Sequence, residues 1–582
     1  MSFLGVEQSL SGREWLGPGV ELDRAAEALA QETGLPRAVA QVLARRGVEA
    51  TEAQDFLAPS LKVLLPDPRS LKDMEAAAAR FLQAVGRKEK IAVFADYDVD
   101  GGTSAALLLD WLRQMGREAT LYVPDRIDEG YGPNVPAMQA LAEAHDLIIC
   151  VDCGTLSHEP IAAAEGADVL VLDHHLGGET LPAALAVVNP NRQDETGDLA
   201  HLCAAAVVFL MLVEANRQRR EAGDGNGPQL MAMLDLVALA TVADVAPLVG
   251  VNRAFVVQGL KVMARRERPG LVALADVARM ESAPSSYHLG FLLGPRVNAG
   301  GRIGKADLGA RLLSCGNEAE ARVMAERLDE LNRERREIED GVRAAALDQA
   351  EQRGLDAPLV WAAGEDWHPG VVGIVASRLK EATGRPAVVI GLEGGEGKGS
   401  GRSVSGIDLG ASIQRLASEG LLIKGGGHKM AAGLTVARGR LEEAMARLSE
   451  LLAKQGAGDL GPRALKLDGV LMPGAATVEM IEQLEAAGPY GAGAPAPRFA
   501  FPDCQVLFTK RVGESHLKFS IGDGLGAKLE GIAFGAYDTA LGPAIENHGG
   551  ARFHVAGRLE VNHWRGRVTP QLRLEDAAPA GR

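Results

Sequence analysis

The sequence predicts a multidomain α/β protein that ends in a small β-barrel. Its 582 residues are too many for one hydrophobic core, so about three to five domains are expected. In the first part of the chain, apolar runs rich in β-forming residues alternate with helical patterns, which is typical of a parallel sheet covered by helices. From about residue 463 onward, short β-like runs alternate with turns, which favours a barrel.

The composition is that of an ordinary soluble globular protein, with 47% hydrophobic and 24% charged residues. The sequence has no apolar run of membrane-spanning length and no signal-peptide pattern at its N-terminus, so we expect a cytoplasmic protein. Five cysteines do not make a disulfide framework in so long a chain, which fits a reducing compartment.

The net charge of −16 argues against a polyanionic partner, but the charge is unevenly distributed. From residue 461 onward, thirteen basic residues balance thirteen acidic ones, and nine of the 24 aromatic residues lie there. Local patches in this tail therefore leave nucleic acid open as a partner.

The apolar run 91–95 predicts a buried strand that ends in aspartates. On extended backbone, alternate residues share a face, so three carboxylates would point the same way: Asp96, Asp98 and Asp100. One aspartate would be interpreted as a polar turn. Three carboxylates on one face repel each other unless a cation lies among them, so we favour metal binding. After a turn at Gly101–Gly102, Thr103 or Ser104 can cap a helix over 105–115.

The strand pattern then repeats along the chain. After a short strand at 120–124 and an aperiodic loop at 125–133, the apolar run 145–151 ends in Asp152. The run 168–172 ends in three polar residues, Asp173, His174 and His175. The ends of parallel strands meet at one edge of a sheet, where open α/β proteins bind their ligands. Carboxylate and imidazole ligands together suit Mn²⁺ or Mg²⁺, and the histidines favour Mn²⁺.

Two further patterns could belong to this site. The run 234–248 predicts an apolar helix that breaks at Pro247 and places Asp244 near its end, where only the other acids make it a candidate ligand. Cys150 and Cys153 have CxxC spacing, but no second thiolate pair exists, so we interpret them as core residues rather than as a zinc site.

The second half of the chain predicts a long helix and a second α/β lobe. Residues 294–302 form a glycine-rich loop with two arginines, either a phosphate-binding loop or an ordinary surface loop. The charged segment 318–352 predicts a long helix between two lobes, with most of its charges solvated. Strands at 359–362 and 387–390 follow, with glycine-rich stretches at 400–403 and 425–433 that could bind phosphate. The barrel strands are expected at 465–470, 499–510, 516–521, 527–534, 551–561 and 567–574.

Four motifs occur in a characteristic order: DYDVDG at 96–101, VDCG at 151–154, DHH at 173–175 and TVADVAPL at 241–248. They resemble the metal-site motifs of the DHH phosphoesterase superfamily. EGYG at 129–132 and GPRVNAGGR at 294–302 resemble, within it, the RecJ family of bacterial single-strand-specific 5′ exonucleases. The likeness runs from about residue 30 nearly to the end. Ala204 is one departure, because the family more often has glycine there, and we expect only a small packing change.

The resemblance implies a site that holds two divalent cations, Mn²⁺ or Mg²⁺. The implied metal ligands, with Asp152 as the bridge, are Asp96, Asp98, Asp152, His174 and Asp244. His175 would be a ligand or a proton-handling group, and Asp100 and Asp173 would orient their neighbours from behind.

The resemblance also implies the substrate contacts. GGGHKMAAG at 425–433 is similar to the signature of the DHHA1 substrate-binding domain, and the tail resembles an OB fold. The predicted substrate-binding residues are Arg126, Tyr131, Arg296, Asn298, Arg302, His368, Arg402, His428 and Lys429, with a purely structural role equally expected for His368. In the barrel, the candidates for single-strand binding are Phe508, Lys510, Arg511, Lys518, Phe519 and Trp564, although many barrel aromatics must be core residues.

These expectations define five segments. They are an N-terminal helical segment 1–60, a DHH catalytic domain 61–315, a connecting helix 316–355, a DHHA1 domain 356–460 and an OB-fold domain 461–582. The expected activity is metal-dependent removal of 5′ mononucleotides from single-stranded DNA in repair and recombination, by a cytoplasmic monomer without membrane contact. A single-strand-binding protein and a repair helicase are the protein partners we expect.

Two other functions remain open from the sequence. Some DHH enzymes hydrolyse pyrophosphate, nano-RNA or cyclic dinucleotides, but such small substrates do not require an extended groove or a C-terminal barrel. A non-catalytic single-strand DNA-binding scaffold is the third possibility, and the intact set of motif carboxylates counts against it.

Overall fold

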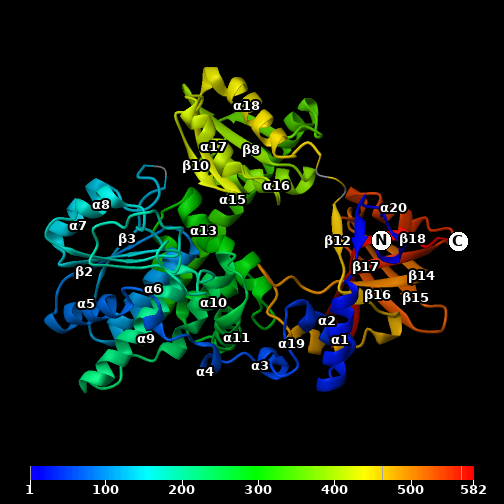
Figure 1. The fold of residues 1–582 in the computed structure, drawn as a ribbon, viewed down its shortest axis with the longest axis horizontal. Coiled ribbons are helices and arrows are strands. Elements are labelled where there is room, and N and C mark those ends of the chain that lie inside the picture. The colour runs from blue at the N-terminus through cyan, green and yellow to red at the C-terminus, as the bar shows by residue number, and fades with distance from the viewer. Residues whose placement is uncertain (1, 127, 460, 462, 565, 582) are drawn as a thin grey trace. The chain divides into compact units, whose positions relative to one another are not determined.

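The structure is a computed structural model that describes residues 2–126, 128–459, 461, 463–564 and 566–581, without the side chain of Trp564. The chain divides into two compact units. One comprises residues 64–459, and the other combines residues 1–63 with 460–582 (Figure 1). Among the described residues, no helix is both long and apolar enough to cross a membrane.

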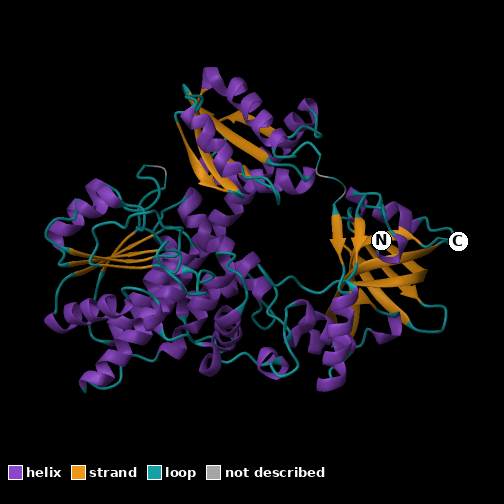
Figure 2. Cartoon of the chain, viewed as in Figure 1, coloured by secondary structure: helices purple, strands orange, loops and turns teal. Residues whose placement is uncertain are grey.

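The larger unit begins with a five-stranded parallel sheet in the order β3-β2-β4-β5-β6. Its strands are β2 (Ile91–Ala95), β3 (Thr120–Tyr122), β4 (Leu147–Val151), β5 (Asp168–Leu172) and β6 (Ala186–Val188). One face packs against α7 (Val135–Ala144) and α8 (His158–Ala162), and the other against α5 (Met74–Arg87), α6 (Val99–Gln114) and α9 (Ala204–Ala222), as Figures 1 and 2 show. The predicted parallel sheet is therefore confirmed. Because both faces are covered, its central strands are wholly buried.

Short helices extend this lobe. They are η2 (Pro68–Ser70), η3 (Leu230–Met233), α10 (Leu234–Ala243), α11 (Gly250–Met263), α12 (Pro269–Val277), the π-helix η4 (His288–Leu293), α13 (Gly294–Ile303) and α14 (Leu308–Ser314). The predicted long helix is α15 (Glu318–Arg353), which the Asn317 side chain caps at its N-terminus. It packs against α12 and α13 at one end and against β7 and α16 at the other, so it joins the two lobes of this unit.

The second lobe is a mixed sheet in the order β10-β11-β9-β8-β7. Its elements are β7 (Val360–Glu365), α16 (Pro369–Thr383), β8 (Ala387–Glu393), β9 (Glu396–Arg402), α17 (Leu409–Ser418), β10 (Lys424–His428), β11 (Ala431–Ala437), η5 (Arg438–Arg440) and α18 (Leu441–Lys454). The glycine-rich stretches predicted as loops are mostly strands. A Cβ at Gly401 would lie 2.7 Å from the Leu409 side chain, and one at Gly425 2.8 Å from that of Ile413. Glycine is needed there because α17 packs directly on the strands.

The smaller unit contains a barrel in which β14, β15, β16, β18 and β17 follow one another and β17 pairs back with β14. Its strands are β1 (Glu14–Leu16), β12 (Ala464–Lys466), β13 (Gly469–Val470), β14 (Phe499–Val512), β15 (His516–Gly522), β16 (Lys528–Ala533), β17 (Arg552–Trp564) and β18 (Arg567–Pro579). Its helices are η1 (Phe3–Gly5), α1 (Val20–Thr33), α2 (Arg37–Arg45), α3 (Ala53–Leu57), η6 (Pro473–Ala475), α19 (Val478–Ala486), η7 (Ala536–Asp538) and α20 (Leu541–Glu546), while α4 (Leu61–Leu64) spans the division between the units.

The N-terminal segment shares its core with this barrel. Leu29, Val39 and Leu43 of α1 and α2 belong to the same buried cluster as Phe499 and Phe519 of the barrel. In addition, β1 pairs in parallel with β12. The segment predicted on its own as residues 1–60 is therefore a structural part of the C-terminal unit.

Trp15→Phe is expected to destabilise this unit by about 1–3 kcal/mol. The indole Nε1 of Trp15 donates a 2.9 Å hydrogen bond to Asp576 Oδ2, and both side chains are fully buried. The substitution leaves a buried carboxylate oxygen without its donor. Urea unfolding followed by circular dichroism would measure the loss. The double variant Trp15→Phe/Asp576→Leu should recover part of it, whereas equal stability of wild type and Trp15→Phe would contradict the role of this bond.

Candidate metal centre

The first motif turns earlier than the sequence predicts. β2 ends at Ala95, and α6 already begins at Val99, so the three aspartates do not alternate along a strand. Asp98 is the N-cap of α6, because its Oδ1 accepts hydrogen bonds from the amides of Asp100 (2.8 Å) and Gly101 (3.2 Å). A Cβ at Gly101 would lie 2.4 Å from the Asp96 carbonyl oxygen, so glycine permits this tight turn.

Asp100 lies in the first turn of α6 and is anchored from behind. Its two carboxylate oxygens accept hydrogen bonds from the backbone amides of Ala204 (2.7 Å) and Ala205 (2.8 Å), at the N-terminus of α9. Its Oδ2 also lies 3.6 Å from His174 Nε2. The departure from glycine at Ala204 leaves the backbone donor in place.

Asp173 orients the two histidines that follow it. Its carboxylate accepts hydrogen bonds from the backbone amides of Thr155 (3.1 Å), His174 (2.8 Å) and His175 (3.2 Å), and it lies 2.8 Å from His175 Nδ1. Burial alone would raise the pKa of Asp173, but the hydrogen bond and the charge of His175 hold it below its usual range. For His175, burial acts in the opposite direction and would lower the pKa, but the hydrogen bond and charge of Asp173 raise it to about 9.

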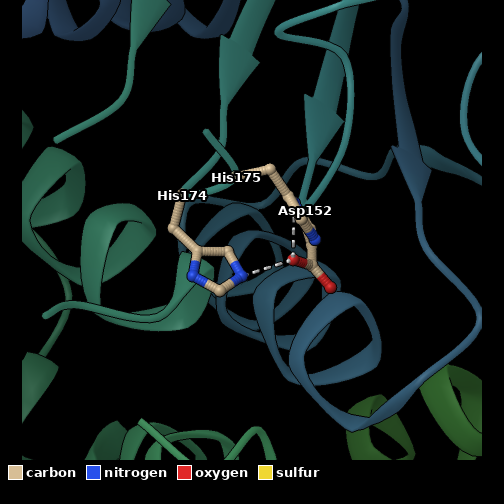
Figure 3. A group of neighbouring side chains, drawn as sticks. All are labelled: Asp152, His174 and His175. Carbon is tan, nitrogen blue, oxygen red and sulfur yellow. Dashed lines mark ion pairs between the residues drawn. The ribbon is translucent and has the colours of Figure 1, made fainter. Parts of the chain in front are cut away.

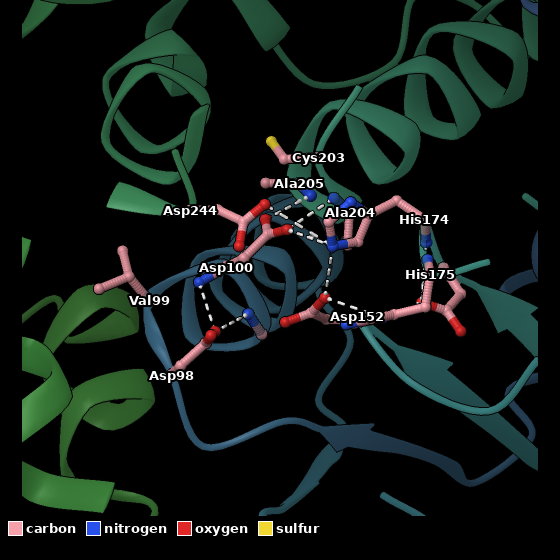
Figure 4. Close-up of polar contacts among 12 residues, drawn as sticks. Asp98, Val99, Asp100, Asp152, His174, His175, Cys203, Ala204, Ala205 and Asp244 are labelled. Atoms are coloured by element: carbon pink, nitrogen blue, oxygen red, sulfur yellow. Dashed lines mark hydrogen bonds and ion pairs between the residues drawn. The ribbon is translucent and has the colours of Figure 1, made fainter. Parts of the chain in front are cut away.

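Asp152 occupies the centre of the site. Its backbone has a left-handed φ of +59°, held by a hydrogen bond from its amide to the Leu172 carbonyl oxygen. Figure 3 shows its Oδ1 between the two imidazoles, 3.3 Å from His174 Nε2 and 3.9 Å from His175 Nδ1. Asp244, just after α10, brings its Oδ2 to 3.7 Å from His174 Nε2 (Figure 4).

Among the described residues, three overlapping groups of side chains could each hold a metal ion. In each group, ligand atoms lie within 4.8 Å of one another, and the groups are Asp152–His174–His175, Asp100–His174–Asp244 and Asp96–Asp98–Asp152. Asp152 belongs to two of them. In this respect the structure agrees with the sequence, because side chains from the ends of β2, β4 and β5 and from α10 converge at one sheet edge.

The electrostatics of this cluster fit bound cations. Burial, followed by the charges of neighbouring aspartates, raises the pKa values of Asp96 and Asp152 well above the usual range and that of Asp244 to about 9. Among the described residues, neither Asp96 Oδ1 nor Asp152 Oδ1 has a hydrogen-bond partner although both atoms are buried. Carboxylate oxygens and imidazole nitrogens are ligands that Mn²⁺ accepts, and these oxygens have lone pairs available for it.

Two asparagines that sequence reasoning missed support the same edge. Asn189 donates from Nδ2 to the carbonyl oxygen of His175 (2.8 Å), and Asn191 donates to that of His174 (2.6 Å). They follow β6 in the sequence Asn189-Pro190-Asn191, and the only signal for them was their place at one more strand end.

A group of cationic side chains lies where the two lobes of the larger unit meet. Arg302 of α13 donates to the Gly370 carbonyl oxygen at the start of α16 (3.0 Å), and Arg402 donates to Ser400 Oγ (2.8 Å). Burial and then the charge of Arg126 lower the pKa of Arg302 to about 10, and the same two causes lower the pKa values of Arg402 and His368. Arg126 itself stacks over the Tyr97 ring at 5.3 Å. Within the described ranges, none of these three arginines forms an ion pair with a carboxylate, so the group is suited to an anion.

Three family models match the chain: the DHH family N-terminal domain over residues 90–241, the DHHA1 domain over 356–454 and the RecJ OB domain over 467–576. The single-stranded-DNA-specific exonuclease RecJ of Dickeya dadantii is 40% identical over 94% of this chain and 96% of that protein. The chain belongs to the RecJ family. RecJ of Escherichia coli is 37% identical over 96% of this chain and 98% of its own length.

Solved RecJ structures agree with this assignment. The crystal structure of RecJ from Thermus thermophilus in complex with Mn²⁺ matches with a TM-score of 0.80 and 29% identity, over 97% of this chain and 79% of that one. A crystal structure of exonuclease RecJ bound to manganese matches with a TM-score of 0.58 and 34% identity, over 67% of this chain and 96% of that one.

The RecJ motif GPRVNAGGR is helical rather than a loop, and two of its predicted substrate-binding residues also contact the scaffold. The predicted loop 294–302 forms most of α13, where Arg296 is buried and pairs with Asp329 (2.8 Å). Asn298 Oδ1 accepts the amide of Val99 (3.0 Å), so it supports the turn beside Asp98. Both residues therefore support the scaffold, and their contact with substrate stays a prediction. Arg302 of the same motif belongs to the cationic group.

The other predicted contacts lie at separate places in the larger unit. Tyr131 is 54% exposed, and its hydroxyl lies 3.1 Å from the Asp152 carbonyl oxygen and within 3.3 Å of the His175 ring nitrogens. His368 caps α16, because its Nδ1 accepts the Gly370 amide (3.0 Å). His428 and Lys429 are exposed at the end of β10.

In the RecJ OB domain, the structure corrects one prediction and adds a residue. Phe519 is buried in the barrel core and cannot contact DNA. Phe508 and Lys510 are exposed, Arg511 stacks over Tyr537, and Lys518 pairs with Glu530, while the side chain of Trp564 lies outside the described residues. Sequence reasoning missed Phe534, which is 52% exposed with Arg573 over its ring at 5.1 Å. Cys150 and Cys153 are buried free thiols, as predicted.

Asp173→Asn is expected to lower kcat/KM for DNA cleavage about 10- to 100-fold, the usual effect of losing a partner behind a ligating histidine. One carboxylate oxygen of Asp173 faces the Thr155 amide, and the other faces the three N–H groups of His174 and His175. An asparagine has only one oxygen, so its NH2 group would face N–H donors on one of these two sides. Single-turnover cleavage at several Mn²⁺ concentrations is the measurement. A variant with wild-type activity and metal dependence would show that this carboxylate does not position the histidines.

Proposed function

We propose that this protein is a metal-dependent exonuclease that degrades single-stranded DNA from its 5′ end to mononucleotides. The observation that carries the proposal is the overlap of three potential metal-binding groups at one sheet edge, with Asp152 common to two of them. The relatives named single-stranded-DNA-specific exonuclease and the RecJ structures that contain Mn²⁺ and Mg²⁺ support it.

The ligand set we propose for two cations consists of Asp96, Asp98, Asp152, His174 and Asp244. When bound, the cations supply an activated water and stabilise the charge that develops on the phosphoryl group. Asp100, tied to the N-terminus of α9, fixes the start of α6 and the environment of His174. Asp173 holds His175 through Nδ1 and raises its pKa, so this ring keeps a proton, and the Tyr131 hydroxyl lies within 3.3 Å of both ring nitrogens.

The cationic group supports the 5′ polarity. The guanidinium groups of Arg302 and Arg402 offer forked N–H donors that suit phosphate oxygens. Arg126 adds a positive charge beside them, and His368 adds a polar ring. A terminal phosphate carries more negative charge than an internal phosphodiester, so a cluster of arginines without carboxylate partners among the described residues favours a phosphorylated strand end.

The barrel supports binding of a longer strand. Phe508 and Phe534 expose their rings. Arg573 lies over the Phe534 ring at 5.1 Å, and Lys510 is exposed on the same strand as Phe508. OB folds bind single strands by stacking bases on aromatic rings, with cations along the backbone. We propose residues 61–315 as the catalytic domain, 356–460 as the substrate-binding domain and 461–582 as the single-strand-binding domain. A single-strand-binding protein and a repair helicase remain the partners we predict.

The test compares four substrates with and without EDTA. They are a 5′-phosphorylated single strand, the same strand with a 5′-hydroxyl, a blunt duplex and pyrophosphate. We expect metal-dependent release of mononucleotides from the 5′ end of the single strand and no cleavage of the duplex. Hydrolysis of pyrophosphate alone would support the small-substrate alternative instead.

Arg402→Ala should raise KM for the 5′-phosphorylated strand about 10- to 100-fold, the range for a hydrogen bond to a charged group. The 5′-hydroxyl strand should be affected much less, since it lacks the dianion. Arg415→Ala is the matched control, because Arg415 is an exposed arginine of α17 that pairs with Glu419. Equal losses on both strands would show that Arg402 does not recognise the terminal phosphate.

A further inference from the structure

Two aromatic side chains form an exposed stacked pair on the larger unit. Tyr287 is 57% exposed and Phe291 64% exposed, their ring centroids lie 5.3 Å apart, and the ring planes differ by only 23°. Large aromatic side chains are normally buried or placed at binding surfaces. The function proposed above does not use either ring.

The pair is held rigidly. Phe291 belongs to the π-helix η4, whose other face is anchored by Leu289 and Leu293, both fully buried. The turn before it is tied by His288, whose Nδ1 accepts the Ser285 amide (3.1 Å) and whose Nε2 lies 3.2 Å from Ser282 Oγ. π-Helical segments are rare and occur often at functional sites.

The position of the pair connects it to the metal centre. η4 packs on the last turn of α10: a Cβ at Gly290 would lie 3.4 Å from the Val242 side chain, and one at Gly294 3.1 Å from Ala243 Cβ. Asp244, a ligand in the proposed metal site, is the next residue of that chain segment. α13 continues directly from η4 and reaches the other side of the site, where Asn298 contacts the Val99 amide (α10 and α13 are labelled in Figure 1).

Val245 is a further exposed apolar side chain beside the site. It follows Asp244 directly, is 69% exposed and has a φ of +60°, a conformation that a β-branched residue rarely adopts. The backbone therefore keeps an apolar side chain in solvent immediately beside a proposed metal ligand. Exposed apolar groups thus occupy both the chain segment of Asp244 and the helix packed on it.

We propose that Tyr287 and Phe291 form a stacking platform for nucleobases of the single strand next to the metal centre. The proposal rests on the single-strand exonuclease function. Two nearly parallel rings present π-faces, and every base has a π-face, so such a platform holds a strand without sequence preference. A nucleic acid occupant is favoured, because the rings belong to a segment packed on the helix that leads to Asp244, and a strand cleaved at that site must approach this surface.

The experiment uses the full-length protein and two 5′-phosphorylated strands of equal length, one with normal bases and one whose first nucleotides are abasic. Tyr287→Ala and Phe291→Ala should each raise KM about 5- to 150-fold on the normal strand, the range for one stacked base. On the abasic strand they should have no effect, because no base is present to stack. Val323→Ala, which truncates a 66% exposed residue of α15, is the matched control.

Phe291→Leu and Tyr287→Leu separate stacking from simple apolar contact and guard against misfolding. They keep apolar bulk, so they should fold as wild type and show a smaller loss than the alanine variants. Equal losses on both strands, or no loss on the normal strand, would show that Tyr287 and Phe291 do not stack on nucleobases. If the wild type cleaves neither strand, the exonuclease function itself fails, which is a distinguishable result.

Discussion

Asp152→Asn is expected to lower the rate of DNA cleavage by more than about 100-fold, because loss of even an outer partner of a metal ligand commonly costs 10- to 100-fold. Asp152 contributes to two of the three potential metal-binding groups, so its loss weakens both cation positions at once. Most of the proposed strand contacts lie elsewhere, so binding of single-stranded DNA should be nearly unchanged. Single-turnover cleavage and fluorescence anisotropy in EDTA would measure the two properties separately.

The same variant has an expected signature in stability. Without metal, the wild type buries the Asp152 carboxylate, and burial and the charges of Asp100 and Asp98 raise its pKa. The neutral asparagine avoids this cost, so the metal-free variant should be at least as stable as the metal-free wild type. Added Mn²⁺ should raise the unfolding temperature of the wild type more than that of the variant, since only the wild type binds it with the full ligand set. Asp198→Asn, an exposed carboxylate of the same lobe, is the control. If the variant retained more than about a tenth of wild-type turnover, Asp152 would not be a ligand shared by two cations.

The candidate site could be predicted in composition but not in local geometry. Strand ends carrying Asp152 and Asp173 were visible as apolar runs that stop at a carboxylate, and parallel topology then brings them to one edge. The aspartates of the first motif were placed on a strand because the period-two pattern was the only signal. The side chain of Asp98 instead captures two backbone amides and starts a helix at Val99, which sequence periodicity cannot reveal.

The glycine-rich segments differ from the predicted loops for a related reason. Glycine indicates either a turn or a close approach of two elements, and the sequence alone does not separate the two. Gly401 and Gly425 lie in strands on which α17 packs, and Gly301 lies in a helix against Tyr97, so each glycine permits a close approach rather than a turn. Arg296 of the GPRVNAGGR motif is then buried and pairs with Asp329. Which of several arginines remains free depends on packing partners from distant parts of the chain.

The barrel was predictable as a series of strands, whereas its partner was not. Six short β-like runs correspond to strands from β12 to β18. No local pattern could show that α1 and α2, more than 400 residues away, complete the same core, because that contact is specified only by the shape of the two apolar surfaces. For the same reason the burial of Phe519 could not be predicted: alternate residues of a strand face opposite sides, but only the closed barrel decides which side is inside.

A chain reduced to residues 64–459 is expected to cleave very short oligonucleotides at nearly the wild-type kcat/KM. Its kcat/KM for long single strands should be much lower than that of the wild type. The metal-binding groups and the cationic group all lie within this range, and it has hydrophobic clusters of its own. Removing only the tail would be a poorer experiment, because it would expose Leu29, Val39 and Leu43 of the N-terminal helices to water. Both segments of the smaller unit must therefore be deleted together.

The expected loss follows from base stacking. Each base stacked on an aromatic ring contributes about 1–3 kcal/mol, so a long strand that loses even one such contact should bind about 5- to 150-fold more weakly. An oligonucleotide too short to reach the barrel cannot respond to its removal. We would measure kcat/KM for a short and a long strand before and after the deletion, in the same salt because phosphate contacts are salt-sensitive. Phe534→Ala in the full chain is the matched variant and should reproduce part of the loss on the long strand alone. Equal losses on both lengths would mean that the smaller unit supports the catalytic unit, and unchanged activity on both would mean that the barrel does not bind the strand.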